Sequence, residues 1–305
     1  MKTVSSLSRA ELGRRLGAGG IILQTGGFVT CVKSPIDSVA DGIALLYADY
    51  PVCDDAEFAD FHISLAPPGG LRRWVRPQVR FDFDGSAPFM PLPIEQAFPM
   101  FEWAMNSCVS SRANGYLIIH AAVVEKDGLA AILPAPSGSG KSTLCAALVS
   151  RGWRLLSDEL ALVRLGSGQL EALPRPISLK NASIDIIRAY VPGAVFSREV
   201  RDTVKGAIAH MKAPAASVVR ALERARPAWI IFPQYKAGAV AELAPVAPAR
   251  AFMDLAGNAF NYSLLGSEGF TALAGLIDAT SAYQFTYSAL DDAVELFARL
   301  QPGAT

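Results

Sequence analysis

Residues 135–142 place glycines, serines and a lysine at the spacing of a phosphate-binding loop. The segment reads APSGSGKS and fits the pattern [A/G]-x-x-x-x-G-K-[S/T]. Glycines let successive backbone N–H groups converge on phosphate oxygens, and the start of the following helix adds partial positive charge. Lys141 is expected to reach the β- and γ-phosphates, and the Ser142 hydroxyl to bind Mg²⁺. The predicted nucleotide contacts are Ser137, Gly138, Ser139, Gly140, Lys141, Ser142 and Thr143.

The flanking segments have the patterns that such a loop requires. The apolar run 129–133 predicts a strand before the loop, and residues 142–150 predict a helix after it. The apolar segment 116–124 and the turn at Asp127-Gly128 predict an antiparallel hairpin that leads into the loop. The loop pattern arises by chance in roughly one or two chains in a hundred of this length. The strand and the helix around it argue against chance.

Two consecutive acids follow the next predicted strand, residues 153–157. A carboxylate at this position can bind Mg²⁺ or accept a proton from an attacking hydroxyl. We therefore predict that Asp158 is the catalytic base, with Ser142, Asp158 and Glu159 as metal ligands. The alternative is that the two acids are an exposed pair at the end of a strand, with no catalytic or metal-binding role.

Further polar residues are candidates for handling phosphate. His120 lies in an apolar run, where a lone histidine is usually a core residue. The predicted hairpin could instead bring it near the loop as a third catalytic residue beside Asp158 and Lys141. Residues 192–217 show little periodicity and are expected to form a substrate loop or lid, or else a solvated loop. The expected substrate or phosphate contacts are Lys180, Arg201, Lys205 and His210.

Composition limits the classes of protein that fit. The 28 basic and 28 acidic residues cancel, which argues against a nucleic-acid or membrane-surface partner. Four cysteines without CxxC spacing and three histidines indicate no metal cluster, and buried reduced thiols are expected. Because no apolar run is long enough to cross a bilayer, the expected compartment is the cytoplasm, where ATP is available.

The order of predicted elements indicates an α/β chain with two parts. Residues 1–112 are expected to form a small N-terminal α+β module without recognisable chemistry, ending in a helix over residues 94–112. Residues 113–305 are expected to form a P-loop kinase domain with a mixed sheet, because an antiparallel hairpin precedes the loop.

Residues 116–165 resemble HPr kinase/phosphorylase. The shared features are His120 before the hairpin, the SGSGKS loop, Arg151-Gly152 after the helix, and the two acids after the next strand. The stretches 174–187, 202–214 and 258–265 resemble the HPr-kinase-related stand-alone kinases, which are relatives of lasso-peptide serine kinases. Two departures are visible: Glu159 stands where HPr kinases have aspartate, and residues 174–180 replace the E-x-R-G-L-G stretch.

The resemblance implies a fold of the HPr kinase and phosphoenolpyruvate carboxykinase type. It also implies ATP, Mg²⁺ and phosphoryl transfer to a hydroxyl, typically serine. By position, Asp158 would be the general base and His120 a phosphate-side partner, while Lys141 and Ser142 would hold ATP and Mg²⁺. The second acid differs from the family and the third acidic Mg²⁺ ligand is not found, so a phosphorylase activity and HPr itself are not implied.

The sequence therefore predicts an ATP-dependent kinase that acts on a serine of a small protein or peptide. A small-molecule kinase and a non-catalytic nucleotide-binding regulatory module are the alternatives. No nucleic-acid or membrane partner is expected, and a homo-oligomer remains possible.

Overall fold

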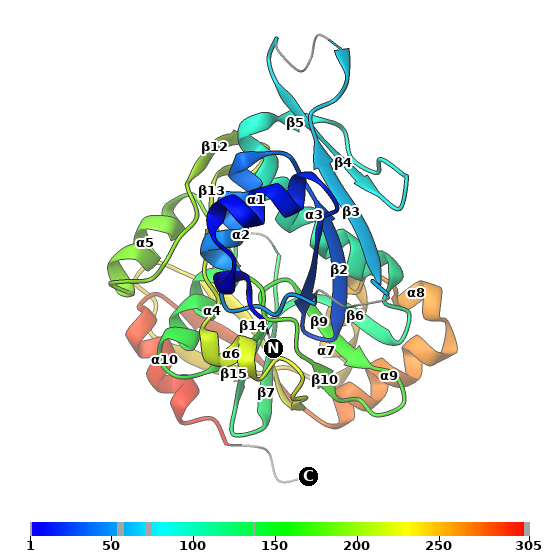
Figure 1. Cartoon of the computed structure of the whole chain (residues 1–305). Coiled ribbons are helices and arrows are strands. Elements are labelled where there is room, and N and C mark those ends of the chain that lie inside the picture. Colours follow the sequence, from blue (N-terminus) through cyan, green and yellow to red (C-terminus); the bar gives the residue numbers. More distant parts are fainter. Residues whose placement is uncertain (1, 54–57, 71–74, 137, 302–305) are drawn as a thin grey trace.

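The computed structural model describes residues 2–53, 58–70, 75–136 and 138–301 of the chain. Ser137, one of the predicted nucleotide contacts, lies outside these residues. The described chain is a mixed α/β structure whose strands form sheets of five, eight and three strands. Figure 1 shows the N-terminal sheet and its helices at one end of the molecule, above the larger sheet.

The N-terminal sheet lies against three helices. Its strands are β1 (Ile21–Thr25), β2 (Phe28–Lys33), β3 (Phe61–Ala66), β4 (Gln78–Phe83) and β5 (Leu92–Pro93), in that order. Buried residues alternate with more exposed ones along β1 and β3, as expected for strands with one face in a core. The helices are α1 (Arg9–Gly17), α2 (Asp37–Leu46) and α3 (Ala97–Arg112), with short 3₁₀ turns at Val4–Ser6 and Ile94–Gln96.

The large sheet contains the predicted hairpin. Its strands run in the order β10 (Leu170–Glu171), β9 (Leu160–Arg164), β6 (Tyr116–Lys126), β7 (Leu129–Pro134), β14 (Arg226–Tyr235), β16 (Ser281–Tyr287) and β15 (Glu242–Pro245), and β8 (Arg154–Ser157) also pairs with β6. β7 is antiparallel to β6 and parallel to β14, so the sheet is mixed, as predicted.

Helices cover both faces of this sheet. The helices that follow the loop are α4 (Lys141–Ser150), α5 (Ala182–Tyr190), α6 (Ala215–Val219), α7 (Pro248–Asn258), α8 (Tyr262–Leu265), α9 (Ser267–Asp278) and α10 (Leu290–Ala298). Along β7, Leu133 packs into the core that contains α4 and α10, whereas Ile132 packs into the core that contains α7 and α9. Burial of one such side chain contributes roughly 1.5–3 kcal/mol. In Figure 1, α9 (orange) and α10 (red) lie on opposite sides of the molecule.

The third sheet corrects the prediction of a loop over residues 192–217. Its strands are β11 (Ile177–Lys180), β13 (Gly206–Met211) and β12 (Val200–Thr203). β12 and β13 form a hairpin that is irregular between Val200 and Thr203. Because β12 reads VRDT and has one buried residue, Thr203, it lacks the apolar alternation that marks a strand in sequence.

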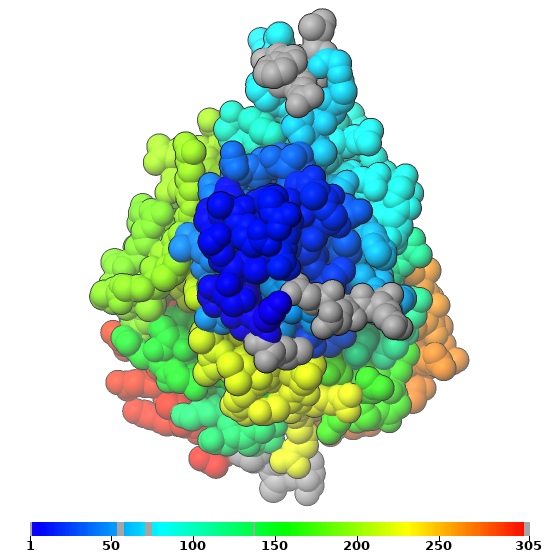
Figure 2. All heavy atoms as spheres, in the orientation of Figure 1, coloured from blue at the N-terminus to red at the C-terminus, as the bar shows by residue number. Residues whose placement is uncertain are grey.

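The N-terminal helices share a core with the rest of the chain. Tyr47 and Phe101 belong to the same buried cluster as Leu144 and Phe285. Figure 2 shows the N-terminal residues (blue) packed directly against the yellow and green parts of the chain. The division into domains at residue 112 stays a prediction. Among the described residues, no helix has both the length and the apolar character needed to traverse a bilayer.

Candidate functional site

The segment between β7 and α4 curls tightly and is held by two neighbouring strands. Gly138 and Gly140 have φ values of +87° and +91°, which side chains rarely adopt. Tyr287 at the end of β16 donates a hydrogen bond of 3.1 Å to the Gly140 carbonyl. The Tyr235 N–H on β14 donates one of 3.0 Å to the Ser139 carbonyl. A Cβ on Gly140 would lie 2.5 Å from the Tyr287 hydroxyl, so only glycine fits here.

The start of α4 has the features of an anion site. Gly140 precedes the helix and has no side chain to cap it, so within the described part of the chain the first N–H groups of α4 are available to a ligand. Ser139 Oγ is buried and lacks a hydrogen-bond partner among the described residues. Ser142 and Thr143 are partly exposed in the first turn. The start of α4 therefore offers backbone N–H groups to an anion, and Lys141 is the first residue of this helix.

Lys141 links the loop to the predicted acids. Its Nζ donates a hydrogen bond of 2.6 Å to the backbone carbonyl of Asp158, and both side chains are buried. Asp158 and Glu159 form the turn between β8 and β9. The Ser157 hydroxyl accepts hydrogen bonds from the N–H groups of Glu159 and Leu160, at 3.3 and 3.0 Å. The structure thus brings the loop lysine and the first acid together.

The Asp158 carboxyl lies under β11. Its Oδ2 accepts a hydrogen bond of 3.1 Å from the Ser178 N–H, while Oδ1 is buried without a partner among the described residues. Burial raises the pKa of Asp158, and the nearby Glu159 adds to this, although Lys141 opposes it. The Ser142 hydroxyl also lies beside this carboxyl and lowers its pKa, without a well-aligned hydrogen bond. The net raised pKa suits a group that accepts a proton.

Glu159 lies among positive charges, and its pKa is lowered whereas that of Asp158 is raised. Burial alone would raise its pKa, but Lys141, Lys180, His120 and Lys205 together leave the pKa lowered. Glu159 is therefore ionised at neutral pH. Two adjacent carboxyls with diverging pKa values are typical of sites where one accepts a proton and the other stays charged.

Lys205 reaches this site from the turn of the β12–β13 hairpin. Its Nζ lies 5.5 Å from the centre of the Trp103 ring, within the range of a cation–π contact. Burial lowers the pKa of Lys205, and Lys180 lowers it further. Lysines 141, 180 and 205 together concentrate positive charge around one carboxylate, an arrangement that favours a phosphate group.

His120 on β6 lies beside the second acid. Its Nδ1 is 3.2 Å from the Glu159 carbonyl oxygen and 3.5 Å from Glu159 Oε2. The ring packs edge-on against Phe260 at 5.9 Å. Burial and then Lys141 lower the pKa of His120, so the ring is neutral at physiological pH. The fold thus brings His120 to the acids, while its catalytic role stays a prediction.

Of the other two predicted contacts, only His210 lies near the acids. Arg201 is exposed on β12 and pairs with Glu199 at 2.9 Å, away from the lysines and acids. His210 on β13 is 1% exposed and packs edge-on against Phe98. His210 nevertheless lines a small cavity beside Asp158.

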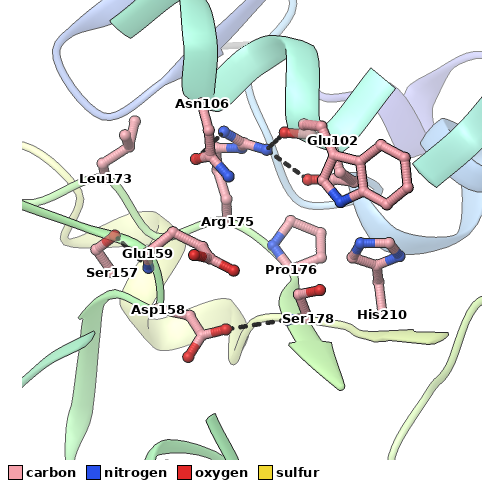
Figure 3. A pocket seen from close by; sticks show the side chains of 11 residues that line it. Glu102, Asn106, Ser157, Asp158, Glu159, Leu173, Arg175, Pro176, Ser178 and His210 are labelled. Atoms are coloured by element: carbon pink, nitrogen blue, oxygen red, sulfur yellow. Dashed lines mark hydrogen bonds and ion pairs between the residues drawn. The ribbon is translucent and has the colours of Figure 1, made fainter. Parts of the chain in front are cut away.

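This cavity contains residues that the sequence did not indicate. Helix α3 contributes Glu102, Trp103 and Asn106, and residues 173–178 form another wall. Figure 3 shows Arg175 reaching Glu102 on one side of the cavity and Asp158 joined to Ser178 on the other. No spacing links residues 102–106 to the loop, and only Arg175, an arginine between two prolines, was unusual in sequence.

Comparisons with known proteins cover part of the chain. The family model described as SynChlorMet cassette protein ScmC matches residues 95–224, which is less than half of the chain but includes α3 and both acids. The solved structure of the Hpr(Ser) kinase/phosphatase from Coxiella burnetii is similar over 60% of this chain and 95% of that chain. The identity is 13% and the TM-score 0.27, too low to establish a shared fold. No curated protein matches the chain.

A metal ion would rely on few protein ligands here. Among the described residues, no group of three or more histidine, cysteine, aspartate or glutamate side chains could hold a metal ion. Mg²⁺ is commonly held by one or two carboxylates together with substrate phosphates and water. Ser142, Asp158 and Glu159, beside the loop, are compatible with that mode of binding.

Proposed function

We propose that this protein is an ATP-dependent kinase of the P-loop, HPr kinase-like type, which transfers a phosphoryl group to a hydroxyl. The observation that carries the proposal is the position of Asp158, whose backbone accepts a hydrogen bond from the loop lysine and whose carboxyl lies beside Ser142. A proton acceptor next to a phosphate-binding loop is what phosphoryl transfer to a hydroxyl requires.

Each residue has a role that its surroundings support. ATP would supply the phosphoryl group, and Mg²⁺ would offset the charge of the phosphates. The N–H groups at the start of α4 would bind phosphate oxygens, and Lys141 would lie beside them. Ser142 and Glu159 would hold Mg²⁺ with Asp158 close by, because Glu159 stays ionised. Asp158 would take the proton from the acceptor hydroxyl, and Lys180 and Lys205 would stabilise negative charge on the transferred group.

The proposed acceptor is a serine on a small protein or peptide. This part rests on the resemblance of residues 116–165 to HPr kinase and on the exposed position of Lys205 in the β12–β13 turn. The neutral His120 is suited to orient a phosphoryl oxygen. The proposed location is the cytoplasm, where ATP is available.

The test compares wild type with Asp158→Asn, using γ-labelled ATP and candidate protein, peptide and metabolite acceptors. Loss of the base should slow transfer by roughly 10²–10⁴-fold, while ATP affinity, measured by calorimetry, changes only a few-fold. Asp185→Asn, at an exposed position on α5, is the matched control and should transfer at the wild-type rate. Equal transfer by Asp158→Asn and wild type would remove the base assignment.

The same assay separates the alternatives. A small-molecule kinase would consume ATP faster with a metabolite than with any peptide. A regulatory nucleotide-binding module would bind ATP tightly and show no turnover with any acceptor.

A further inference from the structure

Tyr235 presents an aromatic ring beside the loop that precedes α4. It is the last residue of β14 and is 54% exposed. Side chains two residues apart on a strand share a face, so Tyr235 lies on the same face as Trp229 and Ile231. Those two residues are buried in the core that also contains Leu144 of α4. Tyr235 therefore lies on the face of the sheet that α4 covers, at the end where the loop curls.

The backbone of Tyr235 is held from two sides. Its N–H donates a hydrogen bond of 3.0 Å to the Ser139 carbonyl, and the next N–H, that of Lys236, donates one of 2.9 Å to the Tyr287 carbonyl. A Cβ on Gly140 would lie 3.2 Å from the Cβ of Tyr235, so the tyrosine side chain starts directly beside the loop. Its ring packs edge-on against Tyr287 at 6.0 Å. The ring is thus fixed in position while half of it faces solvent.

Tyr235 and Asp158 lie on opposite sides of the loop. Strands β8, β6, β7 and β14 are successive neighbours in the large sheet, so β8 and β14 are roughly 14 Å apart at the usual strand spacing. β7, β8 and β14 run in the same direction, which places Asp158, the loop and Tyr235 along one edge of the sheet. When the terminal phosphate lies at Asp158 and the other phosphates follow the loop, the ribose and base are directed toward β14.

We propose that Tyr235 is the platform on which the base of the nucleotide stacks, and that this subsite does not select adenine over guanine. The proposal rests on the proposed function and adds the part of nucleotide recognition that the loop does not supply. Stacking of a base on an aromatic ring raises affinity by roughly 10–100-fold, and every base has a face that can stack.

The segments beside Tyr235 contain little that could distinguish two purines. Residues 236–241 and 288–290 read KAGAVA and SAL, with no carboxylate or amide side chain. The Ser288 hydroxyl donates a hydrogen bond of 2.7 Å to the Ala239 carbonyl, which ties the two segments together. Gln234 precedes Tyr235 by one position and therefore points to the other face of the sheet. An amide or carboxylate is the usual acceptor for the amino group that distinguishes adenine, so we expect stacking without selection.

The experiment measures binding to the full chain by calorimetry in the presence of Mg²⁺. The probes are ATP, GTP and inorganic tripolyphosphate, which has the phosphates without a base. ATP and GTP should bind with affinities within about 5-fold of each other, because both purines stack. Tripolyphosphate should bind roughly 10-fold or more weakly, because it lacks the base.

Two variants test the ring itself. Tyr235→Ala should weaken the binding of ATP and GTP by roughly 10–100-fold and leave the binding of tripolyphosphate unchanged. Tyr235→Phe should bind all three probes as wild type does, because the face of the ring is kept. Phe270→Ala is the matched control: Phe270 is similarly exposed, at 56%, and lies on α9, which packs into the core on the other face of the sheet.

The outcomes separate this inference from the proposed function. Unchanged ATP affinity in Tyr235→Ala would overturn the platform and leave the kinase intact. A strong preference of wild type for ATP over GTP would overturn the lack of base selection. Binding of both nucleotides that depends on Tyr235, without transfer to any acceptor, would support the platform and count against the kinase. Binding of no nucleotide by wild type would overturn both.

Discussion

The guanidinium of Arg175 donates a hydrogen bond of 2.6 Å to Oε2 of Glu102, a residue 73 positions earlier in the chain. Both side chains are buried, and Arg175 also bonds the Glu102 carbonyl and Asn106 Oδ1. Tyr47 donates to the other Glu102 oxygen at 2.8 Å. This network joins helices α2 and α3 to the segment that leads into β11. Because the Ser178 N–H on β11 binds the Asp158 carboxylate, the network also positions the proposed base.

Glu102→Gln should therefore affect both stability and transfer. Breaking a buried ion pair costs roughly 3–5 kcal/mol, because one charge is left without its partner. Urea unfolding should show this loss, and transfer per folded molecule should also fall, since the support of β11 is weakened. Glu125→Gln breaks the buried Glu125–Arg154 pair at the far end of the β6–β7 hairpin and is the matched control. It should lose stability but keep its transfer rate. Equal transfer rates in the two variants would show that Glu102 is structural only.

Gly140→Ala should abolish tight nucleotide binding. The residue has φ +91°, and the new Cβ would meet the Tyr287 hydroxyl at 2.5 Å, so either the loop or the Tyr287 side chain must shift and their hydrogen bond is lost. Gly128→Ala is a close control, because it has φ +81° with no atom within 4 Å of the added Cβ. Both should lose roughly 1–2 kcal/mol of stability from left-handed strain. Calorimetry with ATP should show a loss of affinity of at least 10-fold in Gly140→Ala alone. Unchanged affinity would mean that the curl does not bind the nucleotide.

Lys205→Met should slow phosphoryl transfer by about 10²-fold, as expected when one donor to a developing charge is lost. Its ammonium lies over Trp103 and close to Glu159, where it is placed to contact the transferred group. Steady-state kinetics should show the change mainly in kcat. Lys126→Met, at an exposed position in the β6–β7 turn, should be without effect. A normal kcat in Lys205→Met would exclude this lysine from the site.

His210 should make the protein less stable in acid. Burial lowers the pKa of His210 from its usual 6.5, with Glu102, Glu159, Arg175 and Lys180 as the charged neighbours. Below about pH 6.5 the unfolded chain binds a proton that the folded chain does not, so stability falls as the pH falls and levels off above that value. His210→Phe lacks this contribution, which is at most about 1.4 kcal/mol per pH unit. Urea unfolding between pH 5 and 7.5 should show a shallower slope in the variant. An identical slope would contradict a neutral, buried His210.

The structure confirms the predictions of local structure, which depend on residues close together in the chain. The Asp127-Gly128 turn between two apolar runs led to the hairpin of β6 and β7, and the glycine pattern led to a curl before α4. In both cases the conformation depends on residues within a few positions of one another. The prediction of a loop over residues 192–217 was wrong. The strand β12 has one buried residue of four and is stabilised by pairing with β13, which itself pairs with the distant β11.

The sequence by itself determined which residues are the candidates for the chemistry: the loop lysine and serine, and two adjacent acids after a strand. Only the tertiary structure decided that Lys141 meets Asp158, that Arg201 pairs with Glu199, and that His210 and helix α3 line a small cavity together with Asp158. The physical reason is that these contacts join residues far apart in the chain. Which distant side chains meet depends on how the sheets stack and how the cores pack, and no local spacing encodes that.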